Sequence, residues 1–246
     1  MTMTFNNKIK QTMTIMAMVT ALMITGVSFA QDSYACALNN NCYGVEQKAT
    51  PTYGNKFTVS VPNIDGTGTS GTKFGVIDNW IVFPNGDWME TGAFQGYLDG
   101  SGFKSDEWMM AANLFHNGTP QEIWQSHWLA DINTGTTYTF EYEDDDGDYI
   151  WDARLSGVSK IQKIVSWSRG TGAMTGAEID DNAIIIPKTQ LNSIQLHSGT
   201  SWSNWASANG GFGTIPSSTT EIYIKNHSTN PYQKICVATS SIATCP

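Results

Sequence analysis

Two pairs of neighbouring segments are rich in apolar β-branched and aromatic residues, and a short polar turn joins the members of each pair. In the first pair, 74–83 and 88–98, the turn contains Asn85-Gly86, and both of these residues tolerate the positive φ that tight turns need. The second pair, 137–142 and 149–155, is joined by an acidic turn. Each pair therefore predicts an antiparallel β-hairpin.

Shorter segments that are rich in β-branched and aromatic residues predict further strands. These segments are 56–61, 121–129, 163–168, 175–180, 183–186, 193–197 and 220–224. The apolar run 106–115 fits either a buried strand or a short helix, because periodicity does not decide short apolar runs. Since no span longer than ten residues keeps a 3.6-residue spacing, we predict an all-β protein, an antiparallel β-sandwich of two packed sheets.

The first thirty residues are typical of a secretory signal peptide. Lys8 and Lys10 form a basic region, 15–24 is apolar, and Ser28-Phe29-Ala30 fits a cleavage signal before Gln31. The alternative, a transmembrane anchor, is disfavoured because the apolar run is short for crossing a bilayer. We therefore expect a secreted, extracellular protein, or a periplasmic one, with no membrane attachment after cleavage.

The remaining chain divides by composition. An N-terminal extension rich in Asn, Thr and Gly follows the signal peptide 1–30 and spans 31–71. The β-sandwich then occupies 72–246 as a single domain, since a mature chain of roughly 215 residues fits one large sandwich. We expect it to be a monomer.

Four cysteines in an exported chain predict two disulfides. Cys36 with Cys42 and Cys236 with Cys245 are the simplest local pairs, but three pairings are open. Zinc would need closer cysteine spacing and histidine partners, and the four histidines are scattered through the chain. We therefore expect no zinc site.

The charge balance bears on possible partners. The formal net charge is -9, and only 13 residues are Lys or Arg. Binding phosphates requires clustered cations, so this balance argues against a nucleic-acid partner.

The acidic turn of the second hairpin, Asp144-Asp145-Asp146-Gly147-Asp148, suggests calcium because calcium binds carboxylate oxygens. The EF-hand spacing fails, since no glutamate follows at the last ligand position and the flanking segments are strands. A solvated hairpin tip is favoured, and calcium binding at this turn stays open.

Glu90 is the first candidate for catalysis. Alternation along its strand places it on one face with Trp88, Gly92 and Phe94. A carboxyl group on an aromatic face is costly to ionise unless it is solvated or paired, and proteins make general acids and bases in this way.

Six of the nine tryptophans lie in or beside predicted strands, which is more than one core usually holds, and several of them therefore line a concave face in our interpretation. Flat rings on such a face support a polypeptide or a sugar.

The order of short motifs in this chain resembles the glutamic peptidases, both eqolisin and neprosin-like, which are secreted concanavalin-like β-sandwiches. Trp80 is similar to the tryptophan of the first eqolisin strand, and Met89-Glu90-Thr91-Gly92 to the return strand. Gly176-Ala177-Glu178-Ile179 is similar to the later strand with the catalytic glutamate, and a strand at Trp108 and a hairpin at 135–155 lie between them. The chain departs from the eqolisins at Glu90, where they have glutamine, whereas neprosin-like enzymes use two glutamates.

The resemblance implies a catalytic dyad of Glu90 and Glu178 that hydrolyses polypeptides at acidic pH without metal or cofactor. Glu178 would be the general base that activates water, and protonated Glu90 would stabilise the oxyanion, although the roles could be reversed. Trp80, Trp88 and Trp108 would line the substrate-binding cleft. The site would need no covalent intermediate.

Three alternatives stay open at this point. A concanavalin-like glycoside hydrolase also uses two glutamates among tryptophans, but it usually holds both on one strand. A carbohydrate-binding or surface-adhesion module would bind a polysaccharide through the aromatic face without catalysis. Finally, Glu90 and Glu178 could be solvated carboxylates on an open sheet face.

Overall fold

The structure, a computed structural model, describes residues 42–65, 74–96, 108–116, 119–123, 130–180, 183–205, 211–215, 222–227 and 233–245. The described residues form β-strands and no α-helix. No helix in this part of the chain is long and apolar enough to cross a membrane. The strands are β1 (Cys42–Ala49), β2 (Gly54–Ser60), β3 (Phe74–Val82), β4 (Trp88–Gly96), β5 (Trp108–His116), β6 (Thr119–Ile123), β7 (Ala130–Ile132), β8 (Thr137–Glu143), β9 (Ile150–Leu155), β10 (Val158–Ile164), β11 (Gly172–Ile179), β12 (Thr189–His197), β13 (Trp202–Asn204), β14 (Gly211–Ile215), β15 (Tyr223–Asn226) and β16 (Ile235–Ala238).

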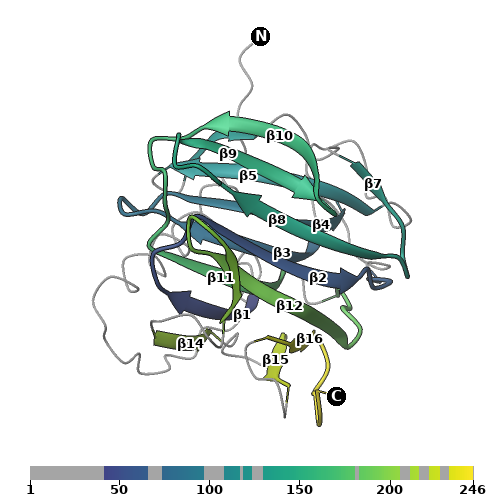
Figure 1. Cartoon of the computed structure of the whole chain (residues 1–246). Coiled ribbons are helices and arrows are strands. Elements are labelled where there is room, and N and C mark those ends of the chain that lie inside the picture. Colours follow the sequence, from purple (N-terminus) through teal and green to yellow (C-terminus); the bar gives the residue numbers. More distant parts are fainter. Residues whose placement is uncertain are drawn as a thin grey trace.

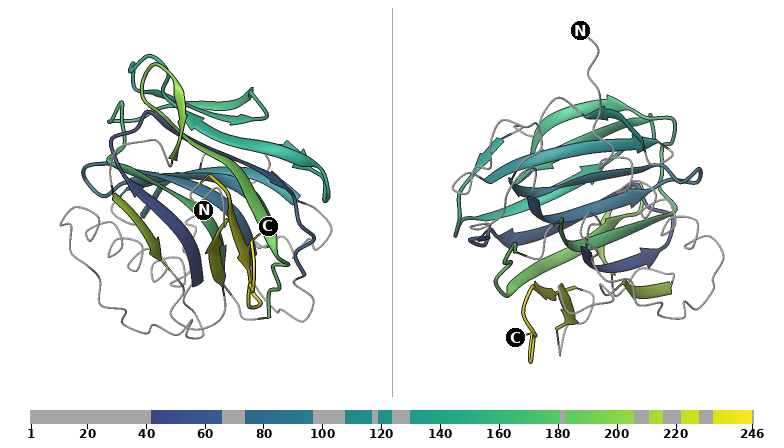
Figure 2. Two further views of the ribbon diagram at one scale, coloured as in Figure 1. Left: turned by 60° about the horizontal axis from the view of Figure 1, so that its bottom comes forward. Right: turned by 180° about the vertical axis from the view of Figure 1, so that it is seen from behind.

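These strands form two antiparallel sheets that lie against each other (Figures 1 and 2). The first sheet has the order β14-β1-β11-β3-β4-β5-β6, and β7 also pairs with β5. The second has the order β10-β9-β8-β2-β12-β16-β15, and β13 also pairs with β12. The predicted all-β sandwich is therefore confirmed.

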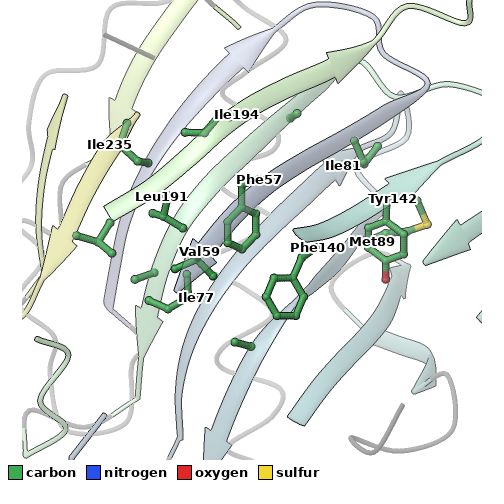
Figure 3. Close-up of a cluster of buried hydrophobic side chains, with 14 of the residues drawn as sticks. Phe57, Val59, Ile77, Ile81, Met89, Phe140, Tyr142, Leu191, Ile194 and Ile235 are labelled. Carbon is green, nitrogen blue, oxygen red and sulfur yellow. The ribbon is translucent and has the colours of Figure 1, made fainter. Parts of the chain in front are cut away.

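The core lies between the sheets (Figure 3). The second sheet contributes large rings, among them Phe57 and Phe140, whose centroids are 5.5 Å apart. The first sheet contributes Ile77, Ile81 and Met89, all fully buried. The alternation along each strand explains this, because every second side chain faces the opposite sheet.

The β3–β4 hairpin forms where the Asn-Gly turn predicted it. Two backbone hydrogen bonds close the turn. The Phe83 N–H donates to the Asp87 carbonyl over 2.8 Å, and the Gly86 N–H donates to the Phe83 carbonyl over 3.0 Å. The Asn85 side chain accepts the Asp87 N–H and holds the turn. The second predicted hairpin is β8–β9, and the ambiguous apolar run 106–115 contains the strand β5.

Four sequence-based assignments need correction. Part of the expected N-terminal extension is built into the sandwich, because β1 pairs with β11 and β14 while β2 pairs with β8 and β12. The strand expected at 163–168 begins earlier, as β10. The segment 183–186 makes one isolated bridge, from Ile185 to Asp65, and the strands β7, β13, β14 and β16 were not predicted. The sequence did not reveal these assignments because whether a segment forms a strand depends on the neighbouring strands against which it packs.

The described cysteines are all in disulfide bonds. Cys236 and Cys245, the simplest of the pairings left open, form a disulfide with Cα atoms 5.6 Å apart. Cys42 is also disulfide-bonded, and the described part of the chain has no free cysteine. The predicted signal peptide and Cys36 lie outside the described residues, and export stays a prediction.

Candidate active site

Glu90 and Glu178 project from the same face of the first sheet. Glu90 on β4 pairs with Trp80 of β3, and Glu178 on β11 pairs with Val76 of the same strand. The residues that alternate with them, including Met89 beside Glu90, point into the core between the sheets. Both glutamates therefore lie on the face turned away from the second sheet.

The two glutamates are buried rather than solvated. Only 7% of Glu90 and 5% of Glu178 is exposed. The alternative of two solvated carboxylates on an open face therefore does not describe this site.

Two of the tryptophans that were predicted to line a substrate-binding cleft, Trp80 and Trp88, are buried. Trp80 is fully buried and Trp88 is 2% exposed. Both belong to a buried cluster on the same face as the glutamates, together with Val45, Val82 and Met174. The side chain of Trp108 lies outside what the structure describes. Trp80 and Trp88 thus pack in this cluster beside Glu90 instead of offering exposed rings.

Trp80 also holds Glu90 directly. Its indole Nε1–H donates a hydrogen bond to Glu90 Oε2 over 2.9 Å. The pairing of Trp80 with Glu90 across β3 and β4 explains this contact, because directly opposite side chains of an antiparallel pair are close.

A third carboxyl group, which the sequence analysis missed, lies between the two glutamates. Asp78 of β3 pairs with Gly92 of β4 and with Gly176 of β11, so it is a diagonal neighbour of both Glu90 and Glu178. Diagonal neighbours have Cα atoms roughly 7–8 Å apart, within reach of long side chains. The signal was available, since alternation along β3 puts Asp78 on the face of Trp80.

Glu90 and Glu178 lie farther from each other than either lies from Asp78. Their partners on β3, Val76 and Trp80, are four residues apart, and β3 lies between β4 and β11. In a flat sheet, spacings of about 4.8 Å between strands and 3.4 Å along them put the Cα atoms of Glu90 and Glu178 roughly 16 Å apart. Asp78 fills the position midway, so the three carboxyl groups form a diagonal row.

Two glycines opposite Asp78 mark close approaches between strands, and one of them, Gly92, lies against Asp78 itself. A Cβ atom on Gly92 would contact the Ile77 carbonyl oxygen and would lie 2.7 Å from Asp78 Cα. A Cβ atom on Gly176 would contact the Gly44 carbonyl oxygen. At Gly92 β4 therefore approaches β3 closely, and at Gly176 β11 approaches β1, as only a residue without a side chain permits.

Asp78 is fully buried, and its two carboxyl oxygens differ. Oδ1 accepts the N–H of Asn79 over 2.7 Å, and the Thr91 N–H also donates to this carboxyl group. Oδ2 is buried without a hydrogen-bond partner. Burial raises the pKa of Asp78 well above its ordinary value, and the charges of Glu90 and then Glu178 raise it further against the two backbone hydrogen bonds.

Hydrogen bonds through the core connect the strands of the site to the second sheet. The Tyr142 hydroxyl of β8 donates to the carbonyl of Glu90 over 2.6 Å. The Asn55 amide of β2 donates to the Met174 carbonyl of β11 over 2.9 Å. The Asn79 amide of β3 donates to the Phe140 carbonyl of β8 over 3.2 Å. Side chains from the core thus attach β3, β4 and β11 to the opposite sheet.

The acidic turn between β8 and β9 is only partly the solvated tip that the sequence favoured. Asp144 is fully buried, and its carboxylate accepts the N–H groups of Gly147 and Tyr149 over 2.7 and 3.0 Å. Asp146 and Asp148 are exposed, and together with Asp144 they bring carboxylate oxygens within 4.8 Å of one another. Among the described residues this is the group whose donor set suits a hard cation.

Comparisons with known proteins bear on the fold. No protein-family model matches the chain, and no curated protein matches it. Among solved structures, scytalido-glutamic peptidase with a transition state analog inhibitor is 12% identical, with a TM-score of 0.55, and the match covers 82% of this chain and 98% of that one. The same peptidase with a peptide based transition state analog gives 13% identity, a TM-score of 0.51 and the same coverage. At this identity the likeness shows the fold, which is that of the glutamic peptidases.

Proposed function

We propose that this protein is a secreted glutamic endopeptidase-like hydrolase that cleaves polypeptides at acidic pH. The observation that supports this most is that Glu90 and Glu178, buried, share one face of a sheet in a sandwich that resembles a glutamic peptidase. Buried carboxyl groups that are close to one another cannot all ionise, which favours work at acidic pH.

The reaction uses the two glutamates in different roles. Ionised Glu178 takes a proton from water, and the water oxygen attacks the carbonyl carbon of the peptide bond. Protonated Glu90 donates a hydrogen bond to the oxyanion that forms, while the Trp80 indole holds its Oε2. The proton on Glu178 then passes to the amine as the C–N bond breaks. No metal and no covalent intermediate takes part.

The site argues against the two rival functions. A glycoside hydrolase of the concanavalin-like type would carry both glutamates on one strand, whereas here they lie on β4 and β11 with β3 between them. A carbohydrate-binding module would need exposed rings, whereas Trp80 and Trp88 are buried.

The test is digestion of denatured protein substrates by the purified chain from Gln31 onward, between strongly acidic and neutral pH. We expect cleavage at acidic pH that chelators and serine-directed reagents leave unchanged. Glu178→Gln should lower the rate by roughly 10²- to 10⁴-fold, because an amide cannot accept the proton of water. Glu90→Gln should lower it less, because an amide still donates to the oxyanion.

A panel of polysaccharides in the same assay separates the alternatives. Cleavage of a polysaccharide, or its binding without any hydrolysis, would replace the peptidase proposal. Peptide cleavage that survives Glu178→Gln unchanged would also contradict the assigned roles.

A further inference from the structure

The middle position of the carboxyl row belongs to a residue that the two-glutamate mechanism does not use. Asp78 is fully buried, so substrate does not reach it, and any role it has acts through Glu90 and Glu178. The charged groups that face it come from the strands on either side, Glu90 from β4 and Glu178 from β11.

The contacts of Asp78 determine where its proton lies. Oδ1 already accepts a backbone N–H and therefore cannot carry the proton as well as the buried, unpartnered Oδ2 can. As a carboxylate, Asp78 would leave a charge on Oδ2 without a donor and next to two glutamates. As a neutral acid, it places no charge between the two glutamates.

The glycine opposite Asp78 on β4 shows that this position is closely packed. Gly92 brings the backbone of β4 against β3, since an added Cβ atom would lie 2.7 Å from Asp78 Cα. A larger neighbour would push the two strands apart. The packing thus favours a neutral group at the centre of the row.

We propose that Asp78 is a positioning residue that keeps its proton across the acidic working range of the site and thereby sets the upper pH limit of the reaction. While Asp78 is neutral, one glutamate can be ionised and the other protonated. When Asp78 loses its proton, a third negative charge faces the pair, and the division of roles between Glu90 and Glu178 is lost. This role rests on the proposed peptidase function, but the protonation of Asp78 can be measured without it.

The kinetic experiment uses Asp78→Asn, which keeps the shape and a donor but cannot ionise. We expect Asp78→Asn to retain activity at acidic pH and to shift the fall of kcat/KM with rising pH by at least one pH unit upward. Asp78→Ala, which leaves the N–H groups of Asn79 and Thr91 without their acceptor, should be less active at every pH. An unshifted fall, or an inactive Asp78→Asn that is folded, would overturn the proposal.

The unfolding experiment does not depend on activity. Because the folded state raises the pKa of Asp78 above its ordinary value near 3.8, stability should be fully present below that pH and should be lost as pH rises toward the folded value. Within that window one such group changes the unfolding equilibrium constant up to tenfold per pH unit. Asp78→Asn should remove this slope, and parallel stability curves for the two proteins would overturn the proposal.

Asp144→Asn is the matched control. Asp144 is as buried as Asp78, and burial raises its pKa too, but it lies in the turn between β8 and β9. It should therefore alter the pH dependence of unfolding without moving that of activity. If the wild-type protein cleaves no polypeptide, the proposed peptidase function is wrong. The unfolding curves then still test whether Asp78 keeps its proton.

Discussion

At the scale of single residues, the surroundings of the Trp80 indole differ from those that the sequence suggested. A tryptophan beside a predicted glutamate was expected to face substrate, yet Trp80 is fully buried and donates to Glu90 Oε2. A buried hydrogen bond to a carboxyl group contributes to stability and also fixes the rotamer of that group.

Trp80→Phe should therefore reduce both stability and activity. Loss of the indole donor should lower the free energy of unfolding by about 1–3 kcal/mol, measured by urea denaturation. Because Glu90 is then no longer held in place, peptidase activity should fall by roughly 10- to 100-fold.

Trp151→Phe controls for the change in size. Trp151 is equally buried, and its Nε1–H donates to the Trp167 carbonyl over 2.7 Å, away from the carboxyl row. It should lower stability by a similar amount and leave activity unchanged. Equal losses of activity in both variants would mean that Trp80 acts only through stability.

At the scale of elements, β3 is the strand on which the site depends. It carries Asp78 and Trp80, lies between the strands of Glu90 and Glu178, and donates the Asn79 amide to the opposite sheet. β4 approaches it closely, and Gly92 is the position where a side chain would meet backbone atoms of β3.

Gly92→Ala should separate β4 from β3. The added Cβ atom would meet the Ile77 carbonyl and the Asp78 Cα, neither of which can move without the strand. We expect a loss of about 1–3 kcal/mol or more in the free energy of unfolding, measured in urea, together with lost activity.

Gly75→Ala is the control for this substitution. Gly75 lies in β3 as well, but a Cβ atom there would meet only side-chain atoms of Ile184 and Ile64, the nearest at 3.0 Å. These side chains can shift, so we expect a loss within about 1 kcal/mol. A loss at Gly92 no larger than that at Gly75 would contradict the close approach of β3 and β4.

At the scale of the whole molecule, the disulfides and the charge suit an exported protein. Cys236 and Cys245 close a short loop at the C-terminal side of the second sheet, where β16 pairs with β12 and β15. The net charge of -9 adds repulsion at neutral pH, so protonation of carboxyl groups at acidic pH relieves it.

Removing this disulfide with Cys236→Ala/Cys245→Ala should destabilise the protein by about 2–3 kcal/mol, because the short loop no longer restricts the unfolded chain. Urea denaturation of the oxidised proteins measures the difference. Adding reductant to the double variant then isolates the contribution of the disulfide at Cys42. An unchanged midpoint in the double variant would show that the Cys236–Cys245 bond does not stabilise the fold.

The sequence by itself was sufficient for the fold class, the two hairpins and the face of Glu90, whereas it left three pairings of the cysteines open. These features depend on local rules: alternation assigns a side chain to one face of a strand, and Asn-Gly turns a chain back on itself. The face of Glu178 needed the motif order as well.

Only the tertiary structure decided which strands are neighbours and in which register they pair. That register put β1 and β2 inside the sheets, buried Trp80 and Trp88, and brought Asp78 between Glu90 and Glu178. The physical reason is that β-pairing joins residues distant in sequence, here Asp78 with Gly176, and its energy comes from cross-strand packing that no local pattern contains.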